Sequence, residues 1–168
     1  MRRKNSRSGN MVLETALWMP VMFLLIAGII QFGKITYIYY SLKKTVNTVA
    51  DYLAVQSGVN FCPDAGDPSI AAAIEFALTG TTDGSGPVAI LDLTPDMIVV
   101  TPQCIDPTTG APGTCNVSGC GTPVGAQRPD YLMVSIPNGY IVTPRIPYIL
   151  IGPIPLKPQA VAAYGGAS

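Results

Sequence analysis

The chain has 168 residues, no formal net charge, no histidine and four cysteines. Hydrophobic residues make up 48% of it and charged residues only 12%, which excludes an intrinsically disordered chain. The balanced charge argues against a dedicated nucleic-acid-binding protein, which would carry a basic excess. Without histidine the chain cannot form a Ser-His-Asp triad, a Cys-His pair or a histidine-ligated metal site, and no cofactor motif is found.

The first nine residues form a basic leader. Residues 1–9, MRRKNSRSG, contain four basic residues and no acidic one, so the rest of the chain has six basic and ten acidic residues. The neutral total is therefore the sum of a basic start and an acidic remainder.

A run of 19 uncharged residues, TALWMPVMFLLIAGIIQFG, follows Glu14. As a helix it would be about 28 Å long, close to the roughly 30 Å hydrocarbon core of a bilayer. The run predicts a single transmembrane helix that spans the membrane over about 12–34, with the basic end in the cytoplasm. A buried helix of a soluble protein would be apolar on fewer faces, and a cleaved secretory signal would be shorter and end in a small-residue site. Pro20 predicts a kink near Ala16.

Apolar residues at three- and four-residue steps continue beyond the membrane and predict one helix over 10–57, with Gly58 as its stop. The stripe consists of Ile35, Ile38, Tyr39, Leu42, Val46, Val49 and Leu53. We expect the C-terminal part of the chain to cover this stripe.

Residues 58–168 predict a small β-rich domain outside the cytoplasm. A short helix should begin at Pro68, capped by Asp67, and end at Gly80. Strands are expected at 88–93, 97–101, 131–137, 139–143 and 159–164. Asn138-Gly139 would suit a tight hairpin turn. The predicted fold is α+β, with a four- or five-stranded, mainly antiparallel sheet packed on the long helix.

The proline-rich segment 144–158 is apolar. We expect it to cover the sheet, with the membrane surface or a partner as the alternative contacts.

All four cysteines fall in the outer domain, where an oxidising compartment would favour disulfides. Three pairings are possible. We favour Cys62–Cys104 and Cys115–Cys120, because the second pair closes a very short loop. A four-thiolate zinc site is the alternative, but the cysteine spacing suits it poorly.

Glu14 stands at the head of the apolar run. A carboxylate at the bilayer centre costs roughly 2.5–3.5 kcal/mol on insertion scales, so it needs a function or a partner unless it lies at the interface. Gly9 precedes it by five positions. A basic leader, a glycine and a glutamate at the fifth following place resemble a type IV prepilin signal.

Residues 9–55 resemble more particularly the TadE family, the pilin-like proteins of Tad systems, which build Flp-type pili. That family shows Gly, a stretch ending V-E-F-A-L, then L-P, then a Leu-rich run ending near E-F-G-R. The matching residues are Gly9, Glu14, Ala16, Leu17, Pro20, Phe32 and Gly33. The departures are Thr15, Gln31 and Lys34. Near the C-terminus, YLMVSIPNGYIVTP and PLKPQAVAAYG are similar to the closing strands of the family.

The resemblance implies a protein of the bacterial inner membrane, cut between Gly9 and Asn10 by a prepilin peptidase. The new amine of Asn10 would then lie beside Glu14 of its own or a neighbouring subunit. Expected partners are the lipid bilayer, the peptidase and other pilin-like subunits, but no nucleic acid. Its role would lie in pilus biogenesis, adhesion or secretion.

Two other functions are open at this stage. A pseudopilin of a type II secretion system would share the architecture. A membrane-tethered enzyme could use a pair of the outer aspartates, as glycosidases do. Most of these aspartates, however, adjoin proline or glycine in apparent turns, where aspartate is favoured for backbone reasons.

Overall fold

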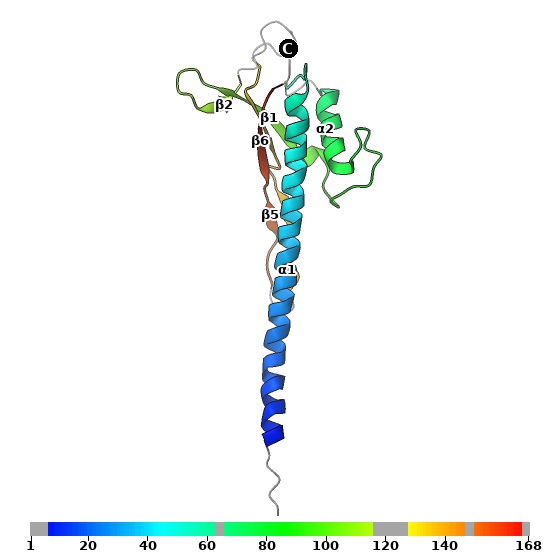
Figure 1. Cartoon of the computed structure of the whole chain (residues 1–168), viewed down its shortest axis with the longest axis vertical. Helices are drawn as coiled ribbons and strands as arrows, with labels where there is room; N and C mark the ends of the chain where they lie inside the picture. Colours follow the sequence, from blue (N-terminus) through cyan, green and yellow to red (C-terminus); the bar gives the residue numbers. More distant parts are fainter. Residues whose placement is uncertain (1–6, 63–65, 116–127, 147–149, 166–168) are drawn as a thin grey trace, which may run out of the picture. The chain divides into compact units, whose positions relative to one another are not determined.

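The computed structural model describes residues 7–62, 66–115, 128–146 and 150–165. The chain divides into two compact units. The helical unit comprises Met1–Tyr37 and Val142–Ile154, and the core unit comprises Ile38–Ile141 and Pro155–Ser168. The predicted α+β fold is confirmed, because a long apolar helix comes first and a small antiparallel sheet follows it along the chain (Figure 1).

Helix α1 (Arg7–Val55) is continuous over 49 residues and passes through Pro20 without a break. It begins three residues before Asn10, so the last residues of the basic leader are already helical. It ends three residues before Gly58, whose positive φ of 73° redirects the chain. The predicted stripe is largely correct, since Leu42, Val46, Val49 and Leu53 are fully buried, whereas Tyr39 is 42% exposed.

The C-terminal end of α1 is capped by two residues that follow the last strand of the chain. The Tyr164 hydroxyl donates to the Gln56 carbonyl at 2.8 Å, and the Gly165 amide donates to the Ala54 carbonyl at 2.9 Å. The last carbonyls of a helix have no partner within it, so these two bonds satisfy acceptors that would otherwise depend on water. The Tyr164 ring also meets Phe61 edge to face at 5.4 Å between centroids.

Helix α2 (Pro68–Thr79) forms where its end signals predict it. The Asp67 carboxylate accepts from the Ser69 amide at 2.7 Å, and Pro68 takes the first helical position. Gly80 adopts φ 79° and donates its amide to the Phe76 carbonyl, which ends the helix. Phe76 also packs against Tyr52 of α1, with ring centroids 5.6 Å apart.

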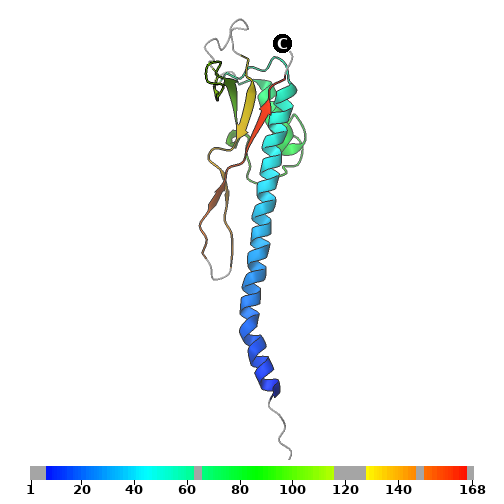
Figure 2. The same cartoon turned by 60° about the vertical axis from the view of Figure 1, so that its left-hand side comes forward.

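Four antiparallel strands form the main sheet in the order β2-β1-β3-β6 (Figures 1 and 2). They are β1 (Val99–Ile105), β2 (Pro112–Thr114), β3 (Tyr131–Ser135) and β6 (Gln159–Ala163). Leu132 pairs with Ala162, and Val134 with Ala160, so these residues lie on one face of the sheet. That face is the buried one, because Leu132 and Val134 are 0% exposed and alternate with half-buried neighbours.

The core joins this sheet face to the C-terminal half of α1, to α2 and to the chain between them. Its largest fully buried side chains are Leu42, Leu53, Leu132, Ile136, Val46, Val49, Val134 and Pro158. The amphipathic stripe of α1 is therefore covered by sheet and helix, which explains why a helix this long stays apolar on that side after the uncharged run ends.

The strand predicted at 88–93 is wrong. The segment forms turns, and only Ile90 and Leu93 are buried, a spacing of three that fits a turn and not a strand. Asp92 has a positive φ of 63°. A 3₁₀ turn, η1 (Pro95–Met97), occupies the start of the strand predicted at 97–101, and β1 then runs past its expected end.

The chain turns at Asn138-Gly139 as predicted, but the strands on the two sides of the turn do not pair with each other as a hairpin. The turn exists, since the Gly139 amide donates to the Ile136 carbonyl at 3.0 Å. However, β3 pairs with β1 and β6, whereas β4 (Tyr140–Val142) pairs with β5 (Ile154–Leu156) in a separate two-stranded sheet. The chain therefore leaves the main sheet at this turn.

The predicted loop 144–158 does not simply cover the main sheet. Its last part contains β5, which pairs with β4 (Figure 2). Residues Val142–Ile154 belong to the helical unit together with Met1–Tyr37. We call these residues the 142–154 segment.

The favoured disulfide pairing is wrong. Cys104 is bonded to Cys115, with Cα atoms 4.8 Å apart, so Cys104 is not joined to Cys62. The reason is the register of β1 and β2, which places Cys104 opposite Gly113, next but one to Cys115. Cys62 is itself disulfide-bonded, and Cys120 lies outside the described residues.

Candidate membrane anchor and assembly site

The first half of α1 exposes large apolar side chains on every side. Leu13, Leu17, Phe23, Ile29 and Phe32 are each 66–73% exposed. The helix is long and apolar enough to cross a membrane, with a mean hydropathy of 2.0 in its most apolar window and no part of that window buried. Water would penalise such a surface, whereas hydrocarbon would not, so α1 is suited to anchor the chain in a membrane.

Glu14 lies on this exposed part of α1. Among the described residues, no hydrogen bond or ion pair to its carboxylate is present. Asn10 and Glu14 are four residues apart in continuous helix, so both positions share one face of α1. A positive group at the backbone nitrogen of Asn10 would therefore stand one turn from the carboxylate.

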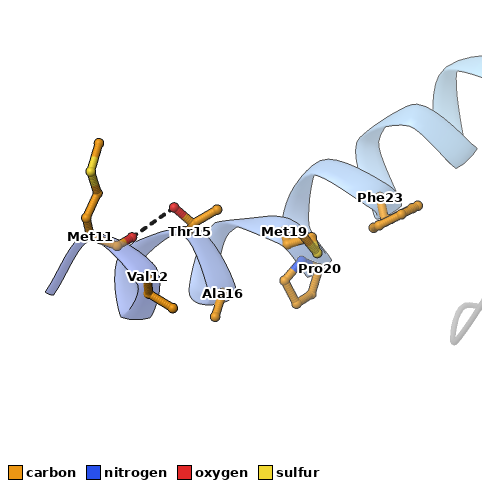
Figure 3. A pocket seen from close by; sticks show the side chains of 7 residues that line it. All are labelled: Met11, Val12, Thr15, Ala16, Met19, Pro20 and Phe23. Atoms are coloured by element: carbon orange, nitrogen blue, oxygen red, sulfur yellow. Dashed lines mark hydrogen bonds between the residues drawn. The ribbon is translucent and has the colours of Figure 1, made fainter. Parts of the chain in front are cut away.

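A shallow apolar hollow lies on α1 where Pro20 interrupts the backbone hydrogen bonds (Figure 3). It is lined by Met11, Val12, Thr15, Ala16, Met19, Pro20 and Phe23. The Thr15 hydroxyl donates to the Met11 carbonyl at 2.9 Å, so this polar side chain is satisfied within the helix. Because proline has no amide hydrogen, the Ala16 carbonyl loses its partner four residues along.

In the sequence, Gln31 is only a departure from the family pattern. The structure shows that its side chain has a hydrogen-bond partner. Its side-chain amide donates to the Arg145 carbonyl at 2.9 Å. The bond joins α1 to the 142–154 segment within the helical unit. The signal available in the sequence is that Gln31 has the only side-chain amide in the 19-residue uncharged run, a group that needs a partner in a membrane.

Three aspartates that were candidates for a catalytic pair accept hydrogen bonds from amides and hydroxyls of nearby loop residues. Asp67 accepts from the amides of Asn60 and Ser69, both at 2.7 Å. Asp83 binds the amide and hydroxyl of Ser85, and Asp106 binds those of Thr108. The bonds from Ser85 and Thr108 hold the pKa of the Asp83 and Asp106 carboxyls below their usual range. These contacts fit the backbone role that aspartate has in turns.

The cysteines give no support to the zinc alternative. A four-thiolate site would need Cys104 and Cys115 as thiolates, but these two are oxidised to a disulfide. Across the described parts of the chain, histidine, cysteine, aspartate and glutamate form no group of three or more that could hold a metal ion.

A long apolar N-terminal helix followed by a small antiparallel sheet defines a protein with a pilin-like α+β fold and a candidate membrane anchor. Residues 9–51 match the family model of the TadE-like proteins, so this part of the chain is TadE-like and the resemblance of the N-terminal helix is confirmed. The match indicates a Tad pilus-associated protein. The chain has no significant match among curated proteins or among solved structures.

Proposed function

We propose that this chain is a pilin-like subunit or assembly protein of a Tad/Flp pilus, acting in pilus biogenesis, adhesion or secretion. It would be held in the bacterial inner membrane with its N-terminus in the cytoplasm and its core unit outside. A prepilin peptidase would cut it between Gly9 and Asn10. The observation that carries the proposal is the family match, which begins at Gly9 and runs along the apolar helix that bears Glu14.

The role of Glu14 follows from its position. Cleavage would create an amine on Asn10, four residues from Glu14 on one helix face. In a low-dielectric surrounding, an unpaired carboxylate is strongly penalised, whereas desolvation offsets much of the gain from pairing. Where the amine is that of a neighbouring subunit, the pair would select one register between neighbouring helices by penalising every arrangement that leaves Glu14 unpaired.

The processing step is tested by the N-terminus of the protein isolated from membranes and from sheared surface material. Mass spectrometry should find Asn10 first, with the MRRKNSRSG leader missing. Gly9→Val, which places a branched side chain beside the cut bond, should leave the leader in place. An intact leader in the wild-type protein would refute the processing step.

The assembly step is tested with Glu14→Gln, which keeps the shape of the side chain and removes its charge. Pilus function should be lost while the protein still inserts in the membrane. Thr15→Val is the matched control, because it removes the adjacent hydroxyl, which bonds only within its own helix. If Glu14→Gln assembled as well as wild type, the register argument would be wrong.

A further inference from the structure

The 142–154 segment is the second part of the chain that belongs to the helical unit. Its described parts, 142–146 and 150–154, lead from the end of β4 and back to the start of β5 (Figure 2). We infer that the described parts of this segment enter the outer head-group region of the bilayer beside α1 and form a second membrane contact.

The bond between Gln31 and Arg145 sets the depth of the segment. Gln31 lies within the uncharged run, three residues before Lys34. With a rise of about 1.5 Å per residue, Gln31 is roughly 4.5 Å below the charged end of that run. The Arg145 carbonyl that it contacts at 2.9 Å is therefore at membrane depth as well.

The face of α1 around Gln31 supports the same placement. Gly28, Gln31 and Ile35 are half-buried and follow each other at steps of three and four residues, while most of the surrounding run is exposed. These positions form one helical face. Gln31 itself meets the 142–154 segment on that face.

The composition of the segment suits a lipid contact more than water. No charged residue occurs between Arg145 and Lys157. Leu150 is fully exposed and Ile151 is 39% exposed, on the limb that returns to β5. Such an exposed aliphatic pair is stabilised by entering the apolar boundary of the bilayer.

The backbone of the segment is also adapted to this depth. Irregular chain cannot face hydrocarbon, because its unpaired amides would be unsatisfied. Two of the ten described residues of the segment, Pro144 and Pro153, are prolines, which have no amide hydrogen. The exposed Arg145 side chain can reach the head-group phosphates while the aliphatic residues lie deeper. The segment is therefore suited to the head-group boundary and not to the bilayer centre.

The inference rests on membrane anchoring by α1 and is independent of cleavage at Gly9. The test uses the full chain with Trp18→Phe, which removes its only tryptophan. New tryptophans are then placed one at a time by Leu150→Trp, by Phe23→Trp as a reference within the apolar run, and by Val161→Trp as a control. Val161 is a suitable control because it is 60% exposed on strand β6 of the core unit.

Each variant is reconstituted in phosphatidylethanolamine–phosphatidylglycerol vesicles that contain phosphatidylcholine brominated near the head-group end of its chains. Bromine should quench Leu150→Trp several-fold more than Val161→Trp, and aqueous iodide should do the reverse. Equal quenching of the two by iodide would overturn the inference. If Phe23→Trp were also insensitive to phosphatidylcholine brominated near the middle of its chains, anchoring itself would be wrong.

A neighbouring copy of the chain could cover Leu150 instead of lipid. In that case the tryptophan would be protected from both quenchers in crowded vesicles, and dilution with lipid would change its signal. That result would also overturn the lipid contact.

The bond to Arg145 gives an independent check. Gln31→Leu added to Leu150→Trp should reduce bromine quenching, because the segment loses its hydrogen bond to α1. The matched control Phe32→Leu changes the adjacent residue, which is 73% exposed, and should leave the quenching unchanged. Unchanged quenching in Gln31→Leu would refute the role of this bond.

Discussion

Gly139 is the residue at which the chain turns from the main sheet into strand β4, and the structure predicts that Gly139→Ala is strongly destabilising. Its φ is +78°, a conformation that costs a residue with a Cβ roughly 1–2 kcal/mol. An added Cβ would also lie 2.9 Å from the Pro155 Cβ and 3.4 Å from the Leu156 carbonyl oxygen. Strand β5 would have to move, and overpacking of this kind costs about 1–3 kcal/mol.

Gly110→Ala provides the matched control. Gly110 has nearly the same conformation, with φ +68°, but an added Cβ would meet nothing within 4 Å. Both substitutions also restrict the unfolded chain to the same degree, so that effect cancels in the comparison. The difference between the two variants therefore isolates the close approach of β5 to Gly139, worth about 1–3 kcal/mol.

The assay is thermal unfolding of the full chain in detergent micelles, followed by near-ultraviolet circular dichroism of the tyrosines. At about 4 °C per kcal/mol, Gly139→Ala should melt roughly 4–12 °C below Gly110→Ala. Equal melting temperatures would show that β5 does not approach Gly139 this closely. The pairing of β4 with β5, and with it the start of the 142–154 segment, would then need revision.

Three further predictions concern the core unit. Replacing Cys104 and Cys115 by serine should lower the unfolding free energy in urea by about 3 kcal/mol, as for an 11-residue loop, and non-reducing peptide maps should join these two cysteines. Tyr164→Phe removes the hydroxyl bond to Gln56, the residue that follows α1, and should cost about 1 kcal/mol, with faster amide exchange at the end of the helix. Burial raises the pKa of Asp67, but amide hydrogen bonds outweigh it and leave this pKa below its ordinary value. Its contribution to stability should be complete above about pH 4 and be lost as the pH falls through the folded pKa, a loss that Asp67→Asn should abolish in melting curves.

The elements that the sequence predicts well are those whose signals are local. Helix α2 is bounded by Asp67, Pro68 and Gly80, and each of these acts on backbone groups within a few residues of itself. The membrane run of α1 needs only length and composition. Strand β3 alternates buried and half-buried residues, so its period of two is visible without knowledge of its neighbours.

The elements that the sequence misses depend on contacts between distant segments. Strands β2 and β5 have only three residues each and contain proline, which disfavours strands on local grounds. They form because β1 and β4 pair with them. The predicted disulfide pairing is wrong for the same reason, since Cys104 and Cys115 meet only through the antiparallel register of β1 and β2.

The two polar residues near the ends of the apolar run, Glu14 and Gln31, illustrate how a membrane helix can divide its functions. A polar group in hydrocarbon needs a partner, wherever that partner comes from. Gln31 has its partner within the same chain, in the carbonyl of Arg145, so its role is internal and holds the 142–154 segment against α1. Glu14 has no such contact among the described residues, and in the proposed function its partner is an amine made by cleavage or carried by another subunit. The two sites are 17 residues apart, about 25 Å along the helix, which is far enough for their effects to be independent. In the proposed function, such a helix exchanges partners at its N-terminal end during assembly while Gln31 keeps the 142–154 segment attached to it.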